Sequence, residues 1–298
     1  MKIALVLTKA MFYSFFDPVV RPLYSMGHDV CIVCRPGFEA DGNKSGRTLL
    51  KLLADVPQAK LEDAHFREKR SSWAITIREL ANYANFLRPG HPMAPPLPWE
   101  HIYMRGRLHP KLYWAAKTRI GSAIFSTSFA RWLLRKIETF FKPEPRIVEW
   151  LKEYKPDVLV ASPYIWSSDL EIEYIKAARK LDIPTIASVL SWDNLVSKGT
   201  YLVKPDWLFV WIRDLTEEAV KLHEFERKKV FIAGAPVFDP WFDLTPSLNR
   251  EQFCRQCGVD PKNPYVLFLG SSKTITDLDV EFIKALIAHF EQVDVESR

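Results

Sequence analysis

The feature that most constrains the fold is a regular alternation of apolar runs and helical stretches between residues 146 and 234. Four short apolar runs, DVLVASP, PTIASVL, DWLFVWI and KVFIAG, are separated by stretches such as SDLEIEYIKAARKLD and TEEAVKLHEF. Short apolar runs indicate buried strands, and strands that alternate with helices of this length form parallel sheets with helices on both faces. The segment therefore predicts a doubly wound α/β domain.

The same pattern opens the chain. KIALVLT and HDVCIVC are apolar runs, and FDPVVRPLYSMG lies between them with Pro18 near its start and Gly27 at its end. Proline suits the first turn of a helix, and glycine suits the position after the last turn. This β-α-β unit joins the later strands, so we expect a Rossmann-like domain of five or six parallel strands that ends near Gly234.

Residues 38–142 interrupt the alternation. They contain two helical stretches, RTLLKLLADV and SSWAITIRELANYANFL, and a proline-rich connector, RPGHPMAPPLPWEH, that cannot form a regular helix. We interpret the whole segment as a helical insertion in the Rossmann-like domain.

The second half of this insertion, from Arg105 to Lys142, is basic and aromatic. Glu138 is its only acid, against nine lysines and arginines: Arg105, Arg107, Lys111, Lys117, Arg119, Arg131, Arg135, Lys136 and Lys142. Its rings are Tyr113, Trp114, Phe125, Phe129, Trp132, Phe140 and Phe141. Such a composition suits an anionic membrane surface. It is equally compatible with a helical subdomain whose rings form a core and whose charges are solvated.

The pattern of an α/β domain starts again near the end of the chain. A linker, APVFDPWFDLTPSLN, and a short helical stretch precede the apolar run YVLFLGSS and a helix that begins near Asp277. We therefore predict one domain over 1–240, with the insertion at 38–142. Residues 241–298 would hold the linker and the incomplete start of a second Rossmann-like domain, whose first strand is Tyr265 to Gly270.

Charge and cysteine content exclude several function classes. The net charge is +5, from 41 Lys and Arg against 36 Asp and Glu, which predicts no nucleic-acid partner. Alternation along a strand sends Cys31 and Cys34 to opposite faces, and Cys254 and Cys257 have no nearby histidine or further cysteine, so we expect no metal site. Reduced thiols and an apolar N-terminal run too short for a signal peptide indicate a cytoplasmic protein.

Ligands of open α/β sheets gather beyond the carboxyl ends of the strands, so the candidate site residues lie in the loops there. The loop SWDNLVSKG holds the most polar groups: Asp193 as a general base or hydroxyl ligand, Asn194 to orient, Lys198 to face phosphate, and Ser191 beside Trp192, whose ring forms an apolar wall. Lys9, Ser14 and Tyr164 follow two other strands. The alternative for SWDNLVSKG is a plain turn, since Asp and Asn favour turns and caps.

Gly270, Ser271 and Ser272 follow the predicted last strand and precede a helix. Free backbone N–H groups in that position form a minimal phosphate cradle. The G-x-G-x-x-G spacing and the P-loop lysine are missing from this segment. Neither a dinucleotide oxidoreductase nor a P-loop NTPase is supported.

Several of these segments together resemble a known superfamily. LSWDNLVSKG, DWLFVWIRDLTEEAVKLH and VFIAGAPVFDPWFD, with FFDPVVRPLYSMGHDV and SSWAITIRELANYANFLRP, are similar to bacterial and archaeal proteins assigned to the GT-B glycosyltransferases. The resemblance covers most of residues 1–290. It implies two Rossmann-like domains with a cleft between them, in which the first domain grips the acceptor and the second the nucleotide-sugar donor.

The resemblance implies transfer of a sugar from a nucleotide sugar, used as co-substrate without a further cofactor, to a glycan or a lipid-linked acceptor. The chain departs from better-known members because no glycine pair or histidine follows the first strand, and the donor-binding positions of the second domain would lie beyond Arg298. The chain alone is therefore expected to be inactive. The alternatives are a sugar-nucleotide epimerase, a glycerophosphotransferase that uses a cytidine nucleotide, or a non-catalytic domain that binds glycans or a membrane.

Overall fold

The structure is a computed structural model that describes residues 1–35, 46–65, 72–92, 108–164, 169–270, 276 and 278–296. It divides into two compact units, unit 1 over Met1–Asp243 and unit 2 over Leu244–Arg298. The two are described separately below.

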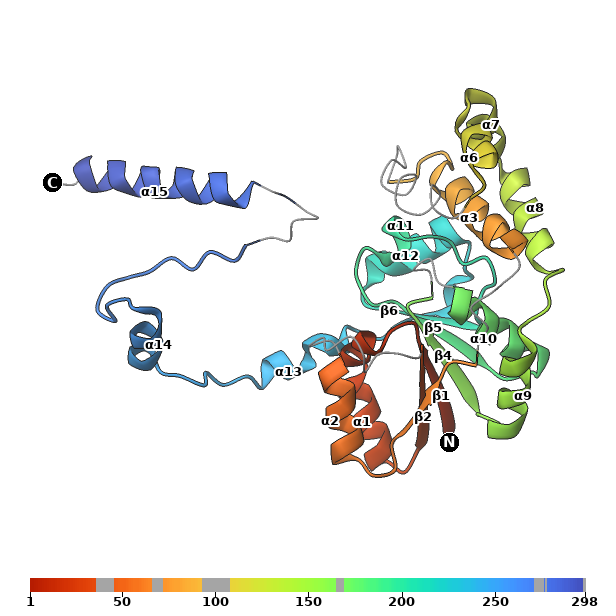
Figure 1. Cartoon of the computed structure of the whole chain (residues 1–298), viewed down its shortest axis with the longest axis horizontal. Coiled ribbons are helices and arrows are strands. Elements are labelled where there is room, and N and C mark those ends of the chain that lie inside the picture. The colour runs from red at the N-terminus through yellow and green to blue at the C-terminus, as the bar shows by residue number, and fades with distance from the viewer. Residues whose placement is uncertain are drawn as a thin grey trace. The chain divides into compact units, whose positions relative to one another are not determined.

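Unit 1 is built on a parallel sheet of seven strands in the order β3-β2-β1-β4-β5-β6-β7 (Figure 1). The strands are β1 (Lys2–Leu7), β2 (Asp29–Cys34), β3 (Lys60–Asp63), β4 (Val158–Ser162), β5 (Thr185–Ser188), β6 (Trp207–Val210) and β7 (Val230–Ile232). β1 pairs with β2 on one side and with β4 on the other. The direction of winding reverses between β1 and β4, which confirms the predicted doubly wound sheet.

Each face of this sheet is covered by its own set of helices. The 3-10 helix η1 (Ala10–Phe15) and helices α1 (Asp17–Ser25) and α2 (Arg47–Asp55) pack on one face, around Leu5 and Ile32. Helices α9 (Pro145–Tyr154), α10 (Asp169–Lys180) and α12 (Arg213–His223) pack on the other face, around Val6 and Leu159. Cys31 belongs to the second cluster and Cys34 to the first, as strand alternation predicts.

The helix between β1 and β2 begins and ends where the sequence predicts. Pro18 lies in the first turn of α1, and Gly27 follows the helix with φ of 81°. Glycine adopts this left-handed conformation without the steric cost that a Cβ atom brings. The chain can therefore turn directly into β2.

The predicted insertion at 38–142 is wrong at its start. α2 and β3 are part of the Rossmann-like layer, and β3 pairs with β2 from Cys31 opposite Lys60 to Cys34 opposite Asp63. Only the residues after β3 leave the sheet. The sequence KLED carries no apolar run because β3 is a short edge strand, and edge strands are commonly charged.

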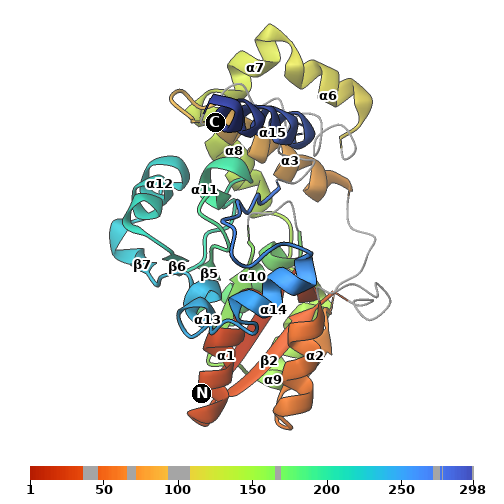
Figure 2. The same ribbon diagram turned by 90° about the vertical axis from the view of Figure 1, so that its left-hand side faces the viewer.

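The remainder of the insertion forms a helical subdomain with its own core. It contains α3 (Ser72–Phe86), α6 (Pro110–Lys117), α7 (Arg119–Phe125) and α8 (Ser128–Glu138). Leu80, Ala84, Tyr113 and Leu134 are buried together there. The hydroxyls of Thr118 and Thr127 cap the amino ends of α7 and α8. Figures 1 and 2 show these helices grouped at one end of unit 1, away from α1 and α2.

A buried ion network joins the helical subdomain to α10. Arg78 of α3 donates hydrogen bonds to the carboxylates of Glu138 of α8 and Glu173 of α10. Lys176 Nζ lies 2.8 Å from Glu138 Oε1, and Glu173 also accepts from the amide of Glu144 at 2.8 Å. Two cations and two carboxylates balance each other, which fixes three separate segments of the chain against one another.

Short helices flank β7, the last strand of unit 1. The 3-10 helix η4 (Arg227–Lys229) precedes β7, and the 3-10 helix η5 (Pro236–Phe238) and helix α13 (Asp239–Phe242) follow it. Unit 2 contains α14 (Arg250–Cys257), which starts with a capping box between Asn249 and Gln252, and α15 (Asp279–Glu296).

The prediction of a strand from Tyr265 to Gly270 is wrong. These residues form no strand, and no strand occurs in the described part of unit 2. A strand needs a neighbour to take its hydrogen bonds, and none is present there. None of the described helices is long and apolar enough to span a bilayer.

Candidate functional site

The loop that follows β5 carries the densest group of polar side chains at the carboxyl edge of the sheet. It runs from Val189 into the one-turn helix α11 (Asn194–Ser197). Because the strands are parallel, this loop shares an edge with the loops that follow β1 and β4. The structure thus places Ser191, Trp192, Asp193, Asn194 and Lys198 where ligands of such sheets bind.

Asn194 holds the loop closed from within. Its side chain is buried, and its Oδ1 accepts hydrogen bonds from the backbone N–H groups of Leu190 at 2.8 Å and Ser191 at 3.1 Å. These two bonds fix which end of the amide is oxygen. In the described part of the protein, Nδ2 has no hydrogen-bond partner. Both bonds of Oδ1 go to the backbone of the same loop, so Asn194 is a structural support of this loop.

Asp193 is ionised at neutral pH. Its Oδ2 accepts a hydrogen bond from Ser197 Oγ at 2.6 Å and lies 3.5 Å from Lys198 Nζ. Burial favours the neutral acid, but hydrogen bonds from Ser191 and Ser197 and the charge of Lys198 outweigh it, so the pKa of Asp193 falls below its ordinary value. Because it is ionised at neutral pH, this carboxylate can accept a hydrogen bond or a proton without first losing a proton of its own.

Trp192 is the one aromatic residue of the SWDNLVSKG loop, and it is 69% exposed. The adjacent Ser191 is half-buried. An indole that stands at the carboxyl edge of a sheet offers an apolar face against which a sugar or a base can stack. Lys198, by contrast, turns toward Asp193 of its own loop.

His223 holds this loop in place from α12, a role that sequence reasoning missed. The ring is fully buried, and its Nε2–H donates to the carbonyl oxygen of Leu195 at 2.7 Å. Burial lowers the pKa of His223 to about 3, so the ring is neutral. A histidine near the end of a helical pattern carries no signal of such a partner, because Leu195 lies 28 positions away.

The prediction that Tyr164 lines the cleft is wrong. Its ring is buried in the core and stacks on Tyr201 with 5.0 Å between ring centroids. Its hydroxyl donates to the carbonyl oxygen of Val203. Both the ring and its hydroxyl are used inside unit 1, so Tyr164 does not face an acceptor.

The loop after β1 places the other two candidates at the same edge. Lys9 is exposed at the start of η1, whereas Ser14 is half-buried and donates to the carbonyl of Met11 at 2.9 Å. Sequence reasoning missed the neighbouring pair, in which Thr8 donates to the buried carboxylate of Glu171 at the start of α10. This pair lies at the switch point between β1 and β4.

An apolar cavity of about 430 Å³ lies against the sheet beside these loops. Its walls come from α1, from the strands β1, β4, β5 and β6, and from the segment after β7, and include Phe16, Val160, Phe209 and Trp211. Val189 and Leu190, which lead into the SWDNLVSKG loop, also line it. The volume is within the range of small-molecule sites. The polar loop and an apolar cavity therefore adjoin at the carboxyl edge.

The predicted phosphate cradle belongs to unit 2. Ser271 and Ser272 lie outside the described residues. A Cβ atom on Gly270 would lie 3.2 Å from Oδ2 of Asp279 in the first turn of α15. A carboxylate at this position repels a phosphate, so the structure gives little support to Gly270 as a ligand of the donor phosphate.

Comparisons with known proteins place the chain in no family. No protein-family model matches the sequence, and no curated protein matches it. Among solved structures, MurG of Acinetobacter baumannii is similar over 79% of this chain and 45% of its own, with 10% identity and a TM-score of 0.37.

Two further structures are similar at 10% identity: the spinosyn rhamnosyltransferase SpnG complexed with thymidine diphosphate, and the glycosyltransferase VinC in complex with DTDP. SpnG matches 70% of this chain and 45% of its own at a TM-score of 0.30, and VinC 65% and 36% at 0.28. This chain thus spans less than half the length of each of the three. TM-scores this low carry no argument beyond the parallel sheet described above.

Proposed function

We propose that the protein is a glycosyltransferase of the GT-B type, which transfers a sugar from a nucleotide-sugar donor to a glycan or lipid-linked acceptor. The observation that carries the proposal is the SWDNLVSKG loop, which stands at the carboxyl edge of a doubly wound parallel sheet beside an apolar cavity. The resemblance of this loop and of the segments after it to the GT-B superfamily supports the same activity.

In this proposal unit 1 binds the acceptor. Trp192 stacks on a sugar ring, and the Asp193 carboxylate accepts a hydrogen bond from the acceptor hydroxyl and takes its proton as the bond to the donor sugar forms. Asn194 and His223 do not touch the substrate; they hold the loop in place. Lys9 stands at the same edge as a cation for an anionic group of the substrate.

The helical subdomain is attached beside the site, and the apolar cavity at the site supports an acceptor with a lipid part. Asn82 of α3 accepts a hydrogen bond from the amide of Thr200, directly after the loop, and Arg88 donates to the carbonyl of Lys221 on α12. The subdomain is thereby tied to the site on two sides. The apolar cavity offers a place for a hydrocarbon portion of such an acceptor.

A transfer assay tests the proposal. The 298-residue chain alone is expected to be inactive, so the assay uses the full-length protein. It is incubated with uridine, guanosine, cytidine and thymidine diphosphate sugars, each labelled in the sugar, together with bacterial lipid extract or oligosaccharide as acceptor. Label is expected in the acceptor with one donor, and Trp192→Ala is expected to lower this transfer with little change in fold. Trp207→Phe, a change of an exposed indole at the start of β6, serves as the matched control.

Other products would replace the proposal. Release of cytidine monophosphate from cytidine diphosphate glycerol would favour a glycerophosphotransferase. Conversion of the labelled sugar while it remains on its nucleotide would favour an epimerase. Binding of oligosaccharide without any turnover of the donors would favour a non-catalytic glycan-binding domain.

A further inference from the structure

Helix α8 has an apolar side on the outside of the molecule. Its inner side, with Ala130 and Leu134, is buried. The outer side presents Phe129, Trp132, Leu133 and Lys136, a set that we call the outward stripe and whose spacing of three and four residues places it on one face. The exposed fraction is 65% for Phe129 and 52% for Trp132. The outer face of a surface helix is ordinarily polar.

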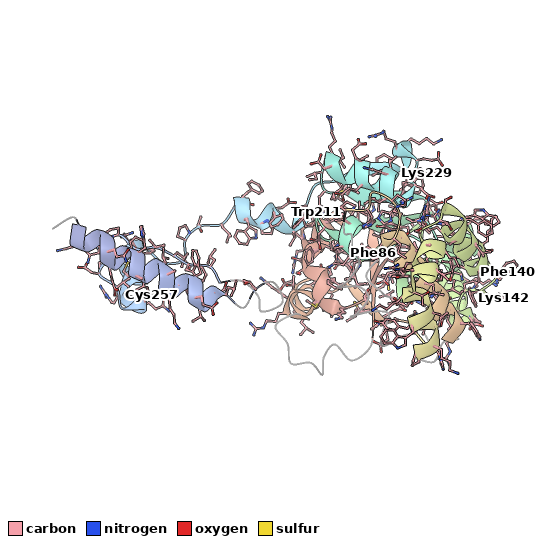
Figure 3. All side chains as sticks on the ribbon, turned by 90° about the horizontal axis from the view of Figure 1, so that it is seen from above. Phe86, Phe140, Lys142, Trp211, Lys229 and Cys257 are labelled. Carbon is pink, nitrogen blue, oxygen red and sulfur yellow. The ribbon has the colours of Figure 1, made fainter. Side chains whose placement is uncertain are left out.

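The neighbouring helices extend this apolar surface. Trp114 of α6 and Ile120 and Ile124 of α7 are more than half exposed, as is Phe140 just after α8. Figure 3 shows Phe140 and Lys142 projecting outward on the side of unit 1 formed by these helices. The core interpretation holds for Tyr113, which is buried, but not for these side chains. Exposed apolar side chains concentrated on one subdomain indicate an interaction surface.

Among the described residues from 108 to 142, every exposed ionised side chain is a cation. The described residues from 108 to 142 carry Lys111, Lys117, Arg119, Arg131, Arg135, Lys136 and Lys142. Their one acid, Glu138, is fully buried and neutralised by Arg78 and Lys176. Lys117 Nζ lies 5.4 Å from the ring centre of Trp114, so a cation accompanies the ring. The surface is therefore apolar at its centre and positive at its margin.

A basic cavity of about 340 Å³ borders the outward stripe. Arg135 and Thr139, on the adjacent side of α8, line it together with Arg179, Lys204 and Lys229. Asp206 is its single acid, and this carboxylate is engaged by the amide and hydroxyl of Thr185. Arg135 also pairs with Glu224. Lys229 pairs with Glu226, so these two carboxylates offset part of the charge, and the remaining cations attract an anion such as a phosphate headgroup.

We infer that α7 and α8 dock on an anionic lipid bilayer, with the outward stripe, Ile120 and Ile124 in the interface and the flanking cations against the headgroups. The phosphates of a nucleic acid would bind the cations, but its bases would gain no stacking from the aliphatic side chains of Ile120, Ile124 and Leu133. A protein partner would need a matching acidic rim. Hydrocarbon below anionic headgroups matches both features at once. The inference is independent of the proposed transferase activity.

The test is binding of the whole 298-residue chain to vesicles of phosphatidylcholine with 30% phosphatidylserine, and to vesicles of phosphatidylcholine alone. Tryptophan emission is expected to shift to shorter wavelength only with the anionic vesicles, because Trp114 and Trp132 enter the interface. Binding is expected to weaken steadily from 0.05 to 0.5 M salt, since salt screens the attraction. Equal partition to neutral and anionic vesicles, or to neither, would overturn the inference.

Two variants separate the apolar and the charged contributions. Phe129→Ser with Trp132→Ser removes most of the outward stripe, and each change is expected to weaken binding at least about tenfold. Lys117→Gln with Lys136→Gln is expected to weaken it about fivefold for each charge and to flatten the dependence on salt. Lys152→Gln with Lys180→Gln removes two exposed charges from α9 and α10 and is the matched control, with no change expected.

The folded state of each variant is checked by its thermal unfolding midpoint. If the stripe variant binds as tightly as the parent protein while folded, the inference is wrong. It is also wrong if the control variant loses as much affinity as the Lys117 and Lys136 variant, because general charge would then explain the binding. Binding to duplex DNA in place of vesicles would contradict the choice of a lipid surface.

Discussion

Replacement of Arg78 by methionine tests how the helical subdomain is held to the sheet. Arg78 lies 4% exposed between the carboxylates of Glu138 and Glu173, which are 0% and 1% exposed. In Arg78→Met, Lys176 is the cation that the described ion pairs leave beside the two buried carboxylates. Removal of one partner from such a pair costs about 3–5 kcal/mol, a large fraction of the about 5–15 kcal/mol that ordinarily stabilises a domain.

Urea unfolding followed by circular dichroism measures this loss. Arg227→Met is the control, because Arg227 makes a two-bond contact with Glu217 at 2.6 Å but both side chains are more than half exposed. Its midpoint is expected to stay close to that of the parent protein. Arg78→Met combined with Glu138→Leu removes one charge of each sign and should recover much of the loss.

Hydrogen exchange locates the effect. In Arg78→Met the amides of α3 and α8 are expected to exchange faster, because the ion network is a main link between these helices and α10. If the midpoint of Arg78→Met matches that of Arg227→Met, the network does not hold the subdomain and the reasoning fails.

Three other changes have defined outcomes. Burial holds the pKa of His223 at about 3 in the folded protein, against 6.5 ordinarily, so the unfolded chain takes up the proton first. The free energy of unfolding therefore falls by about 1.4 kcal/mol per pH unit between pH 6.5 and about 3, and His223→Gln should reduce this slope in acid unfolding curves. Burial raises the pKa of Cys31 to about 12, whereas Cys257 is exposed, so a thiol reagent should label Cys257 and leave Cys31 unmodified in the folded protein. A Cβ atom on Gly121 would clash with the carbonyl oxygen of Ala115, so Gly121→Ala should force α6 and α7 apart and lower Tm by about 4 °C or more, while an unchanged Tm would refute this packing.

Strands within the sheet could be predicted because their apolar runs are longer than those of the loops. KIALVLT, HDVCIVC and the four runs after residue 156 all became strands. β3 could not be predicted in this way because its residues, KLED, are held by pairing with β2 at the edge. The run from Tyr265 to Gly270 is apolar and was predicted as a strand, but it forms none. Local composition does not reveal whether a partner strand is present.

The candidate site was predictable where one loop held it. The SWDNLVSKG loop stood out because its polar residues are contiguous, and the strand before it fixed the edge on which it lies. Tyr164 was predicted on the same rule, but its ring turns into the core, and position after a strand does not determine the direction of a side chain. The contacts of His223 and of Glu171 join segments far apart in the chain and left no local pattern.

The most direct test of the claim that the loop after β5 carries the reaction is the variant Asp193→Asn. Its turnover is measured in the sugar-transfer assay, and its thermal stability is measured beside it. Asparagine can still accept the hydrogen bond from Ser197, so Tm is expected to change by about 4 °C at most. The amide cannot take the proton of an acceptor hydroxyl, so kcat is expected to fall by about 10²–10⁴-fold. An unchanged kcat in a variant with the Tm of the parent protein would contradict the account.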